Sequence, residues 1–215
     1  IVKDQAEMIA ISYANRTDLT YGSDDEMEKV NRQYVSGWMF DSFGLKPALG
    51  RLFTENDDLT PQAHPYAVLS YDYWSSRFAR DPKAIGRSFR IFHDSFQIIG
   101  VAPQGFRGTE PGVGVDIFLP TMMHAGVTQA DSSWFRAFVR LKPGARAEPL
   151  CDRMRAPFQS AQEERARGFR GMPKQTLTNF LHQKLILEPA SSGNSGMQRE
   201  YNSALTALGA LVALV

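Results

Sequence analysis

Hydrophobic and polar residues alternate twice within the first 35 positions. The alternation is weak over residues 9–13 and clearer over residues 27–35, and Asp, Gly and Ser gather between them at 18–25. Period-two alternation is typical of a strand with one buried face, whereas Asp, Gly and Ser favour turns. We therefore predict two strands joined by a turn.

A short amphipathic helix is predicted next, over residues 38–43. Ser36 and Gly37 break the preceding strand, and Gly44 stands where a left-handed cap ends a helix. Residues 45–50 are expected to form an extended connector.

From residue 51 the pattern changes to short elements separated by turns. Ser70 can cap a helix whose aromatic residues Tyr73, Trp74 and Phe78 fall on one face, where they are expected to pack in the core. Four glycines and one proline with few apolar side chains make residues 104–114 a loop. Strands are predicted at 66–70, 88–92, 96–101 and 116–119, with a tight turn at His93 and Asp94.

The last third is expected to hold a strand at 134–141, a helix with Leu150, Met154, Phe158 and Ala161 on one side, and a final strand at 184–188. Pro157 should kink or interrupt that helix. Helices and strands alternate in irregular order and no repeat is visible, so the fold class is α+β or mixed α/β.

The final twelve residues, 204–215, carry no charge. Twelve helical residues are too few to cross a bilayer core, which takes about 20. A buried core helix is one interpretation, but only Thr206 is polar, so we favour the first turns of a membrane helix that continues further. The chain also begins at Ile1 without a signal sequence, and we expect it to be a fragment of a longer protein.

Charge and composition narrow the function classes. The formal net charge of +1 provides no field for recruiting nucleic acid or an acidic membrane. Basic residues do gather between Arg136 and Arg170, but acidic residues interleave with them, as on a solvated helix face. Cys151 is the only cysteine, so no intrachain disulfide can form.

No pattern of residues indicates a catalytic or metal site. The four histidines stand at least 29 positions apart, and neither a dinucleotide fingerprint nor a nucleophile elbow is complete. The acid pair Asp57 and Asp58 is best explained by turns and helix caps. We therefore predict no enzyme activity, no cofactor and no metal.

Specific strings do indicate a family. The segments YVSGWMFDSFGLKPALGRLFT (34–54) and YAVLSYDYWSSRFARDPKAIGRSFRIFHDSFQIIGVAPQGFRG (66–108), followed by VDIFLP (115–120) and FVRLKPGA (138–145), resemble successive landmarks of the MacB-like periplasmic core domain of ABC transporter permeases in the MacB and FtsX superfamily. The segments appear in the family's order and cover nearly the whole chain. The Ser- and Gly-rich stretch and apolar tail are similar in position to the second membrane helix of duplicated orphan permeases.

The resemblance implies a non-catalytic α+β domain outside the bacterial inner membrane. It implies a discontinuous porter-like βαβ subdomain at 1–50 plus 120–190, an inserted small α/β subdomain of the Sabre type at 51–119, a linker at 191–203 and a membrane helix from 204. The implied role is mechanotransmission in efflux or export. Implied partners are the permease's own membrane helices, a second protomer, a cytoplasmic ABC ATPase and a periplasmic adaptor.

The loop at residues 104–114 is the candidate for partner contact. This hypothesis rests on its length, its glycine content and the exposure expected for Phe106 and Arg107. Thr109 and Glu110 belong to the same candidate set. A solvent loop without function is the alternative. At the level of the whole chain, the alternative is a module that binds or senses an extracytoplasmic ligand or protein. An enzyme would need a pocket with converging titratable groups.

Overall fold

The computed structural model describes residues 3–22, 26–129 and 132–190. The predicted linker at 191–203 and the apolar stretch at 204–215 lie outside the described residues. The described strands are β1 (Ala6–Ser12), β2 (Asn15–Thr20), β3 (Met27–Val35), β4 (Leu49–Gly50), β5 (Tyr66–Leu69), β6 (Ser88–Ile91), β7 (Asp94–Val101), β8 (Ile117–Pro120) and β9 (Phe135–Leu141). The described helices are α1 (Met39–Ser42), α2 (Tyr71–Phe78), α3 (Ala147–Gly168) and α4 (Lys174–Leu181).

Six strands close into a ring. They follow the order β2-β6-β7-β5-β8-β3, and β3 pairs again with β2. The pairs β3–β8 and β5–β7 are parallel and the other ring pairs are antiparallel, so the fold is mixed α/β. Beyond the ring, β1 continues from β3 and β9 pairs with β1, while β4 pairs with β7.

The ring has a continuous apolar interior. Every ring strand contributes alternate residues to one buried cluster, such as Leu19, Val30, Phe89, Phe96 and Ile117. Such alternation places these side chains on the inner face of the pleated ring. Helix α2 adds the predicted stripe, Tyr73, Trp74 and Phe78, to the same cluster.

Helix α2 begins as predicted. The Ser70 hydroxyl accepts a hydrogen bond from the Tyr73 backbone N–H, which is the N-cap contact expected from the sequence. The Tyr73 hydroxyl donates to the Glu28 carboxylate on β3 and contacts the Tyr21 hydroxyl. These contacts fix α2 to the β2–β3 hairpin.

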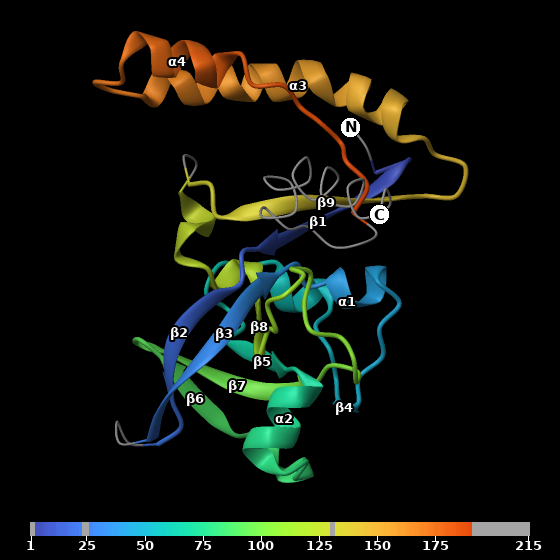
Figure 1. Cartoon of the computed structure of the whole chain (residues 1–215), viewed down its shortest axis with the longest axis vertical. Coiled ribbons are helices and arrows are strands. Elements are labelled where there is room, and N and C mark those ends of the chain that lie inside the picture. Colours follow the sequence, from blue (N-terminus) through green and yellow to red (C-terminus); the bar gives the residue numbers. More distant parts are fainter. Residues whose placement is uncertain (1–2, 23–25, 130–131, 191–215) are drawn as a thin grey trace, which may run out of the picture.

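A second buried cluster lies outside the ring, between it and the β1 and β9 pair. It joins Ile9 and Ile11 of β1 to Phe40 of α1, Val68 of β5 and Phe118 of β8. The last two follow the inward residues of their strands by one position, so their side chains lie on the outer face of the ring. Figure 1 shows β1 and β9 beyond the ring, and α3 with α4 folded back along it as a further layer. Among the residues that the structure describes, one small apolar cluster around Leu150 and Ala6 joins that layer to the strands.

Two sequence predictions about elements are wrong. Residues 184–188 form no strand, because Leu187 packs with Leu150 and the Cys151 thiol donates to the Leu185 carbonyl, which holds this segment against α3. The polar region after residue 14 holds a strand, β2, where the turn was predicted to begin at residue 18.

Pro157 does not interrupt α3, which runs unbroken for 22 residues. This proline is exposed, so solvent can replace the hydrogen bond that its missing N–H cannot make. None of the helices in residues 3–22, 26–129 and 132–190 has the length and hydropathy needed to cross a membrane.

The division into a porter-like part and an inserted part at 51–119 stays a prediction. In the structure one continuous sheet contains strands from both parts, since β2 and β3 pair with β6 and β8.

Candidate partner-contact site and polar joint

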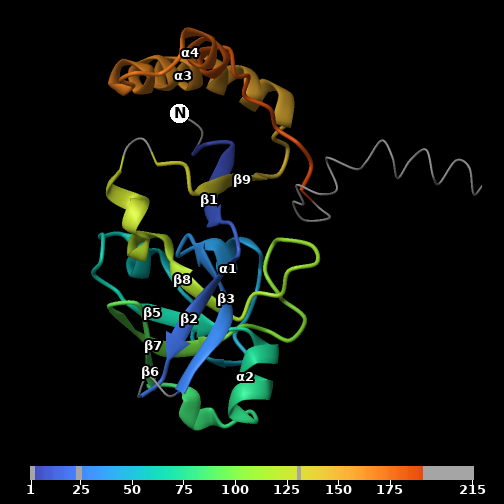
Figure 2. The same cartoon turned by 60° about the vertical axis from the view of Figure 1, so that its left-hand side comes forward.

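The predicted contact loop, residues 104–114, has neither helix nor strand and projects from the side of the molecule (Figure 2). It surrounds a shallow hollow of about 490 Å³. Its base is fixed, because the Asn31 side chain donates to the Gly114 carbonyl and the Asn31 backbone N–H donates to the Asp116 carboxylate at 2.7 Å. Burial is the main cause that raises the pKa of Asp116 above its ordinary value.

Phe106 is not the exposed side chain expected from the sequence. It is half-buried, stacks on Phe118 with ring centroids 5.4 Å apart, and lies edge-on to Phe40 and Phe43. The outer face of the six-strand ring carries an apolar strip, and the Phe106 side chain covers it. Phe106 therefore anchors the loop.

Thr109 and Glu110 also face inward. The Gln33 amide donates to the Thr109 hydroxyl at 3.3 Å, and the Ala14 backbone N–H donates to the Glu110 carboxylate at 2.6 Å. Glu110 also forms an ion pair with Arg136 at 3.6 Å. These two residues therefore tie the loop to the strands behind it.

Arg107 is the one predicted contact residue that is exposed. Its guanidinium pairs with the Asp72 carboxylate of α2 at 3.0 Å, and both side chains are more than half exposed. Such an exposed pair contributes little to stability and can exchange for a partner's carboxylate. The loop's crest, Pro111 to Val113, is also exposed and has an apolar residue at each end, and no sequence pattern had distinguished it from the rest of the loop.

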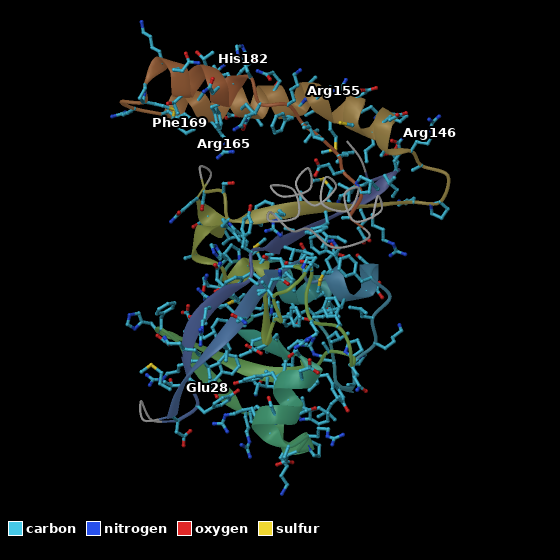
Figure 3. All side chains as sticks on the ribbon, in the orientation of Figure 1. Glu28, Arg146, Arg155, Arg165, Phe169 and His182 are labelled. Carbon is cyan, nitrogen blue, oxygen red and sulfur yellow. The ribbon has the colours of Figure 1, made fainter. Side chains whose placement is uncertain are left out.

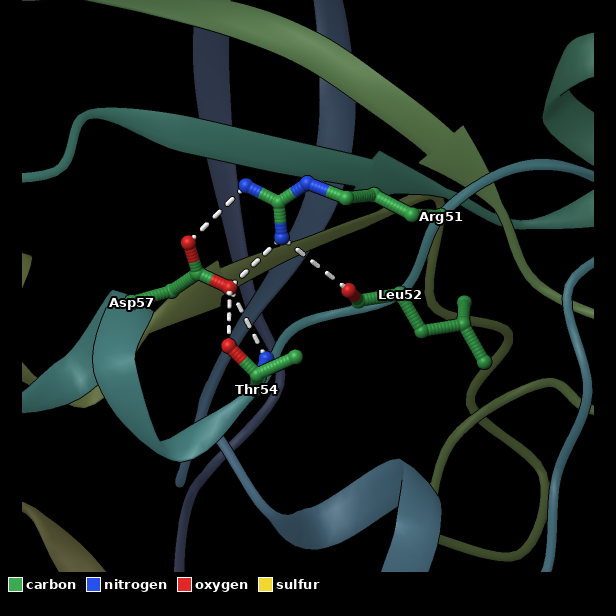
Figure 4. A network of polar contacts seen from close by, with 4 residues as sticks. All are labelled: Arg51, Leu52, Thr54 and Asp57. Carbon is green, nitrogen blue, oxygen red and sulfur yellow. Dashed lines mark hydrogen bonds and ion pairs between the residues drawn. The ribbon is translucent and has the colours of Figure 1, made fainter.

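A polar joint lies where the chain enters the region of residues 51–119 and where it leaves. We use this name for Gly37, Arg51, Thr54, Asp57, Asp58, Thr121 and Met122. Figure 4 shows its first half, in which the Arg51 guanidinium donates to both oxygens of Asp57 at 2.6 and 2.9 Å. The Thr54 backbone N–H and hydroxyl donate to the same carboxylate.

Asp58 forms the second half. Its carboxylate accepts hydrogen bonds from the Gly37 backbone N–H at 3.0 Å, from the Met122 backbone N–H at 2.7 Å and from the Thr121 hydroxyl. Three segments far apart in the sequence therefore meet at one buried carboxylate.

The two adjacent carboxyl groups have pKa values shifted in opposite directions. Burial would raise the pKa of Asp57, but its hydrogen bonds from Arg51 and Thr54 outweigh burial and hold that pKa below the ordinary value. At Asp58 burial outweighs the three hydrogen bonds and raises the pKa. The sequence indicated caps here, and Thr54 with Asp57 does form a capping box. Burial of both acids was missed, because no local pattern reports it.

The basic residues between Arg136 and Arg170 lie only in part on a helix: Arg153, Arg155, Arg165 and Arg167 belong to α3, where acids interleave with them as predicted, whereas Arg136 and Arg140 belong to β9. Figure 3 shows Arg155 and Arg165 at separate positions on α3, and Arg146 just before the helix begins. Arg146 pairs with Glu148 at 3.3 Å, and Arg155 pairs with Asp152 at 2.7 Å. Within the described residues, no group of three His, Cys, Asp or Glu side chains could hold a metal ion.

The strands and helices together define a mixed α/β domain. The sequence profile of the MacB-like periplasmic core domain matches residues 2–156, which is most of the chain. The chain belongs to this family, that of the periplasmic core domains of ABC transporter permeases.

Three solved structures are similar to this chain, and the first of them, with a TM-score above 0.5, shows the same fold. The periplasmic region of MacB from Actinobacillus actinomycetemcomitans superimposes with a TM-score of 0.55 at 16% identity, covering 86% of this chain and 79% of that one. A domain of a putative permease from Porphyromonas gingivalis gives 0.48 at 15% identity, with coverage of 82% and 83%. The extracellular domain of the noncanonic ABC-type transporter YknZ from Gram-positive bacteria gives 0.48 at 17%, with coverage of 76% and 74%. No curated protein sequence matches significantly.

Proposed function

We propose that this domain passes the ATP-driven movement of its permease's membrane helices to periplasmic partners during efflux or export, without catalysis of its own. ATP hydrolysis then belongs to a separate cytoplasmic ATPase, and the partners are a second protomer and a periplasmic adaptor. The observation that carries this proposal is the family match over residues 2–156.

The polar joint supports a mechanical role. A domain that transmits force needs stiff connections between its segments. The Asp58 carboxylate connects its own segment to those of Gly37 and of Thr121 and Met122 through hydrogen bonds. The closed ring adds stiffness, since each of its six strands is paired on both sides.

The test is to separate hydrolysis from transport in the complete permease with its ATPase. Asp58→Asn is expected to lower transport several-fold while ATP hydrolysis stays near the wild-type rate. The reason is that a loosened polar joint would no longer pass the movement of the membrane helices to the periplasmic partners. The control Asp18→Asn removes an exposed carboxylate that pairs with Lys29, and should change neither activity. Unchanged transport in a folded Asp58→Asn protein would contradict the proposal, as would equal losses of both activities.

The 104–114 loop is proposed as the surface that meets a partner, with Arg107 and the crest as the contacting residues. Replacing Pro111 and Val113 by serine should weaken cross-linking to the adaptor and leave the fold intact. The control Leu59→Ser changes an apolar residue that is 58% exposed elsewhere. If deleting residues 104–114 changed neither transport nor adaptor binding, the proposal that this loop contacts a partner would be contradicted.

A ligand-binding or sensing module is the second candidate, and one hollow favours it. A groove of about 750 Å³ runs past the end of β1, where Met8, Trp38, Leu141 and Pro143 provide apolar walls. Because Trp38 lines the groove, quenching of its fluorescence by an apolar peptide, and loss of that signal in Trp38→Phe, would demonstrate binding. Absence of quenching at millimolar peptide would rule out this role for such ligands.

A further inference from the structure

Strand β9 has one free edge among the described residues. The Lys142 backbone N–H donates to the Gln5 carbonyl, which fixes the alternation along the β1–β9 ladder. Arg136, Phe138 and Arg140 therefore bond to β1, and the residues between them point their N–H and C=O groups the other way. Those outward residues are Phe135, Ala137, Val139 and Leu141, and no backbone group of the described chain bonds to them.

This edge has only part of the usual protection against pairing. Natural edge strands are blunted by proline, bulges, very short length or charged side chains, and of these β9 has only the charges of Arg136 and Arg140. Strand β9 has seven residues without proline or glycine, and its register with β1 contains no bulge. Phe135 at its start is 43% exposed, so an apolar side chain stands beside the free edge.

We propose that β9 pairs antiparallel with β9 of a second copy of this chain, with a two-fold axis at Ala137. In this register Arg136 lies opposite Phe138 of the second copy, and Phe135 lies opposite Val139 of the second copy. The second is a favourable cross-strand pair, an aromatic beside a β-branched residue. At the first, the Arg136 guanidinium keeps its existing contacts with Tyr13 and Glu110.

Other two-fold registers fit less well. An axis at Val139 would place Arg136 opposite Lys142 of the second copy, and like charges facing each other across strands are destabilising. An axis at Phe138 is excluded, because the backbone groups of Phe138 already bond to β1. An axis at Phe135 would oppose half of β9 to residues before Phe135, which lie outside the strand.

The pairing specifies the second protomer of the proposed function, on which this inference rests, and it can be tested without any transport assay. Pairing of edges alone buries little apolar surface, so it needs the high local concentration that two permeases in one membrane would have. Trapping the contact in the membrane is therefore the suitable experiment.

The trap is a disulfide across the axis, in the full-length permease carrying Cys151→Ser. In the proposed register the two copies of Ala137 face each other with Cα atoms about 5.5 Å apart, a separation that a disulfide can span. Ala137→Cys should form cross-linked dimers at least about tenfold faster than Ala63→Cys, which places the thiol on an exposed turn. Val139→Cys tests the register, because its two copies would lie about 13 Å apart, beyond disulfide reach.

A second variant tests the backbone hydrogen bonds. Ala137→Pro removes an N–H that points away from β1, so the domain should fold with unchanged circular dichroism, while a chemical cross-linker should capture several-fold less dimer. The control Ala147→Pro adds proline at the first residue of α3, where it is tolerated.

Equal cross-linking of Ala137→Cys and Ala63→Cys would overturn the proposal, and so would equal cross-linking of Val139→Cys. If Ala137→Pro does not fold, the cysteine series decides. Failure of the strand pairing with intact uncoupling by Asp58→Asn would leave the proposed function standing.

Discussion

Gly100 lies so close to Arg51 that a Cβ atom built on Gly100 would be 1.8 Å from the Arg51 carbonyl oxygen. The approach is reciprocal, since a Cβ on Gly50 would be 2.4 Å from the Ile99 carbonyl oxygen. Gly50 and Gly100 are paired in register between β4 and β7. These glycines let two backbones meet at the start of the polar joint, which is why substitutions there are expected to be costly.

Gly100→Ala is expected to lower the free energy of unfolding by at least about 3 kcal/mol, or to prevent folding, because the backbone of Arg51 cannot move without breaking β4. Urea denaturation measures the change. Gly168→Ala is the matched control, since no atom lies within 4 Å of the position where its Cβ would be and it ends a helix. The control should be neutral or stabilising by up to about 1 kcal/mol. Wild-type stability of Gly100→Ala would show that the two strands have room to separate.

Asp57→Asn is expected to cost about 1–3 kcal/mol near neutral pH, because the charge-assisted hydrogen bonds with Arg51 are lost. The folded pKa of Asp57 is lowered, so its contribution is present above the ordinary value of 3.8 and is lost as pH falls through the folded pKa. The difference between wild type and variant should therefore shrink on acidification. Denaturation curves at neutral pH and near pH 3 measure it, and a constant difference would contradict the assignment.

Asp58→Asn should show the opposite pH dependence. The folded pKa of Asp58 is raised, so its contribution is fully present below 3.8 and is lost as pH rises through the folded pKa. The cost of Asp58→Asn is therefore expected to be larger in acid than at neutral pH. Asp58→Ala should cost at least about 3 kcal/mol at any pH, because three buried donors lose their acceptor. Parallel pH profiles for the Asp57 and Asp58 variants would refute this account.

Phe92, at the turn between β6 and β7, is held at a φ of 54° although its ring is 72% exposed. The left-handed conformation costs a residue other than glycine about 1–2 kcal/mol. The contact between the Phe92 ring and the Arg32 guanidinium, 5.6 Å from the ring centroid, stabilises the fold by about 0.5–1 kcal/mol. Phe92→Asn should therefore leave the stability unchanged or raise it by up to about 1 kcal/mol. The buried Phe96→Ala should cost about 3–5 kcal/mol, and a similar loss at Phe92 would contradict the expectation.

Local patterns predicted most elements of this fold. Ser70 capped α2 and Gly44 took the left-handed conformation, because each depends on residues only a few positions apart. The turn predicted at His93 and Asp94 joins two strands but lies one residue earlier, at Phe92 and His93, because Asp94 already pairs with Ile91. Ring closure could not be predicted, since it depends on Thr20 of β2 meeting Arg90 of β6, a pairing across 70 positions. Residues 184–188 alternate as a strand would, but they form none. Their contacts with Leu150 and Cys151 hold them against α3.

The candidate site was predicted in position but not in detail. The glycines and proline located the loop correctly, yet Phe106, Thr109 and Glu110 face inward because their partners come from β8, β3 and the β1–β2 turn. Only Arg107 behaves as the sequence suggested. Asp58 gave no signal of its burial, although its neighbour Asp57 was recognised as a cap.

Ring closure also determines where this molecule can bend. A strand paired on both sides cannot slide without breaking two ladders at once, so a pull applied at either end of the chain should rotate the barrel as a rigid block. Deformation would then concentrate in the connection outside it, at Ser12 to Asn15. That stretch would act as the pivot of a lever.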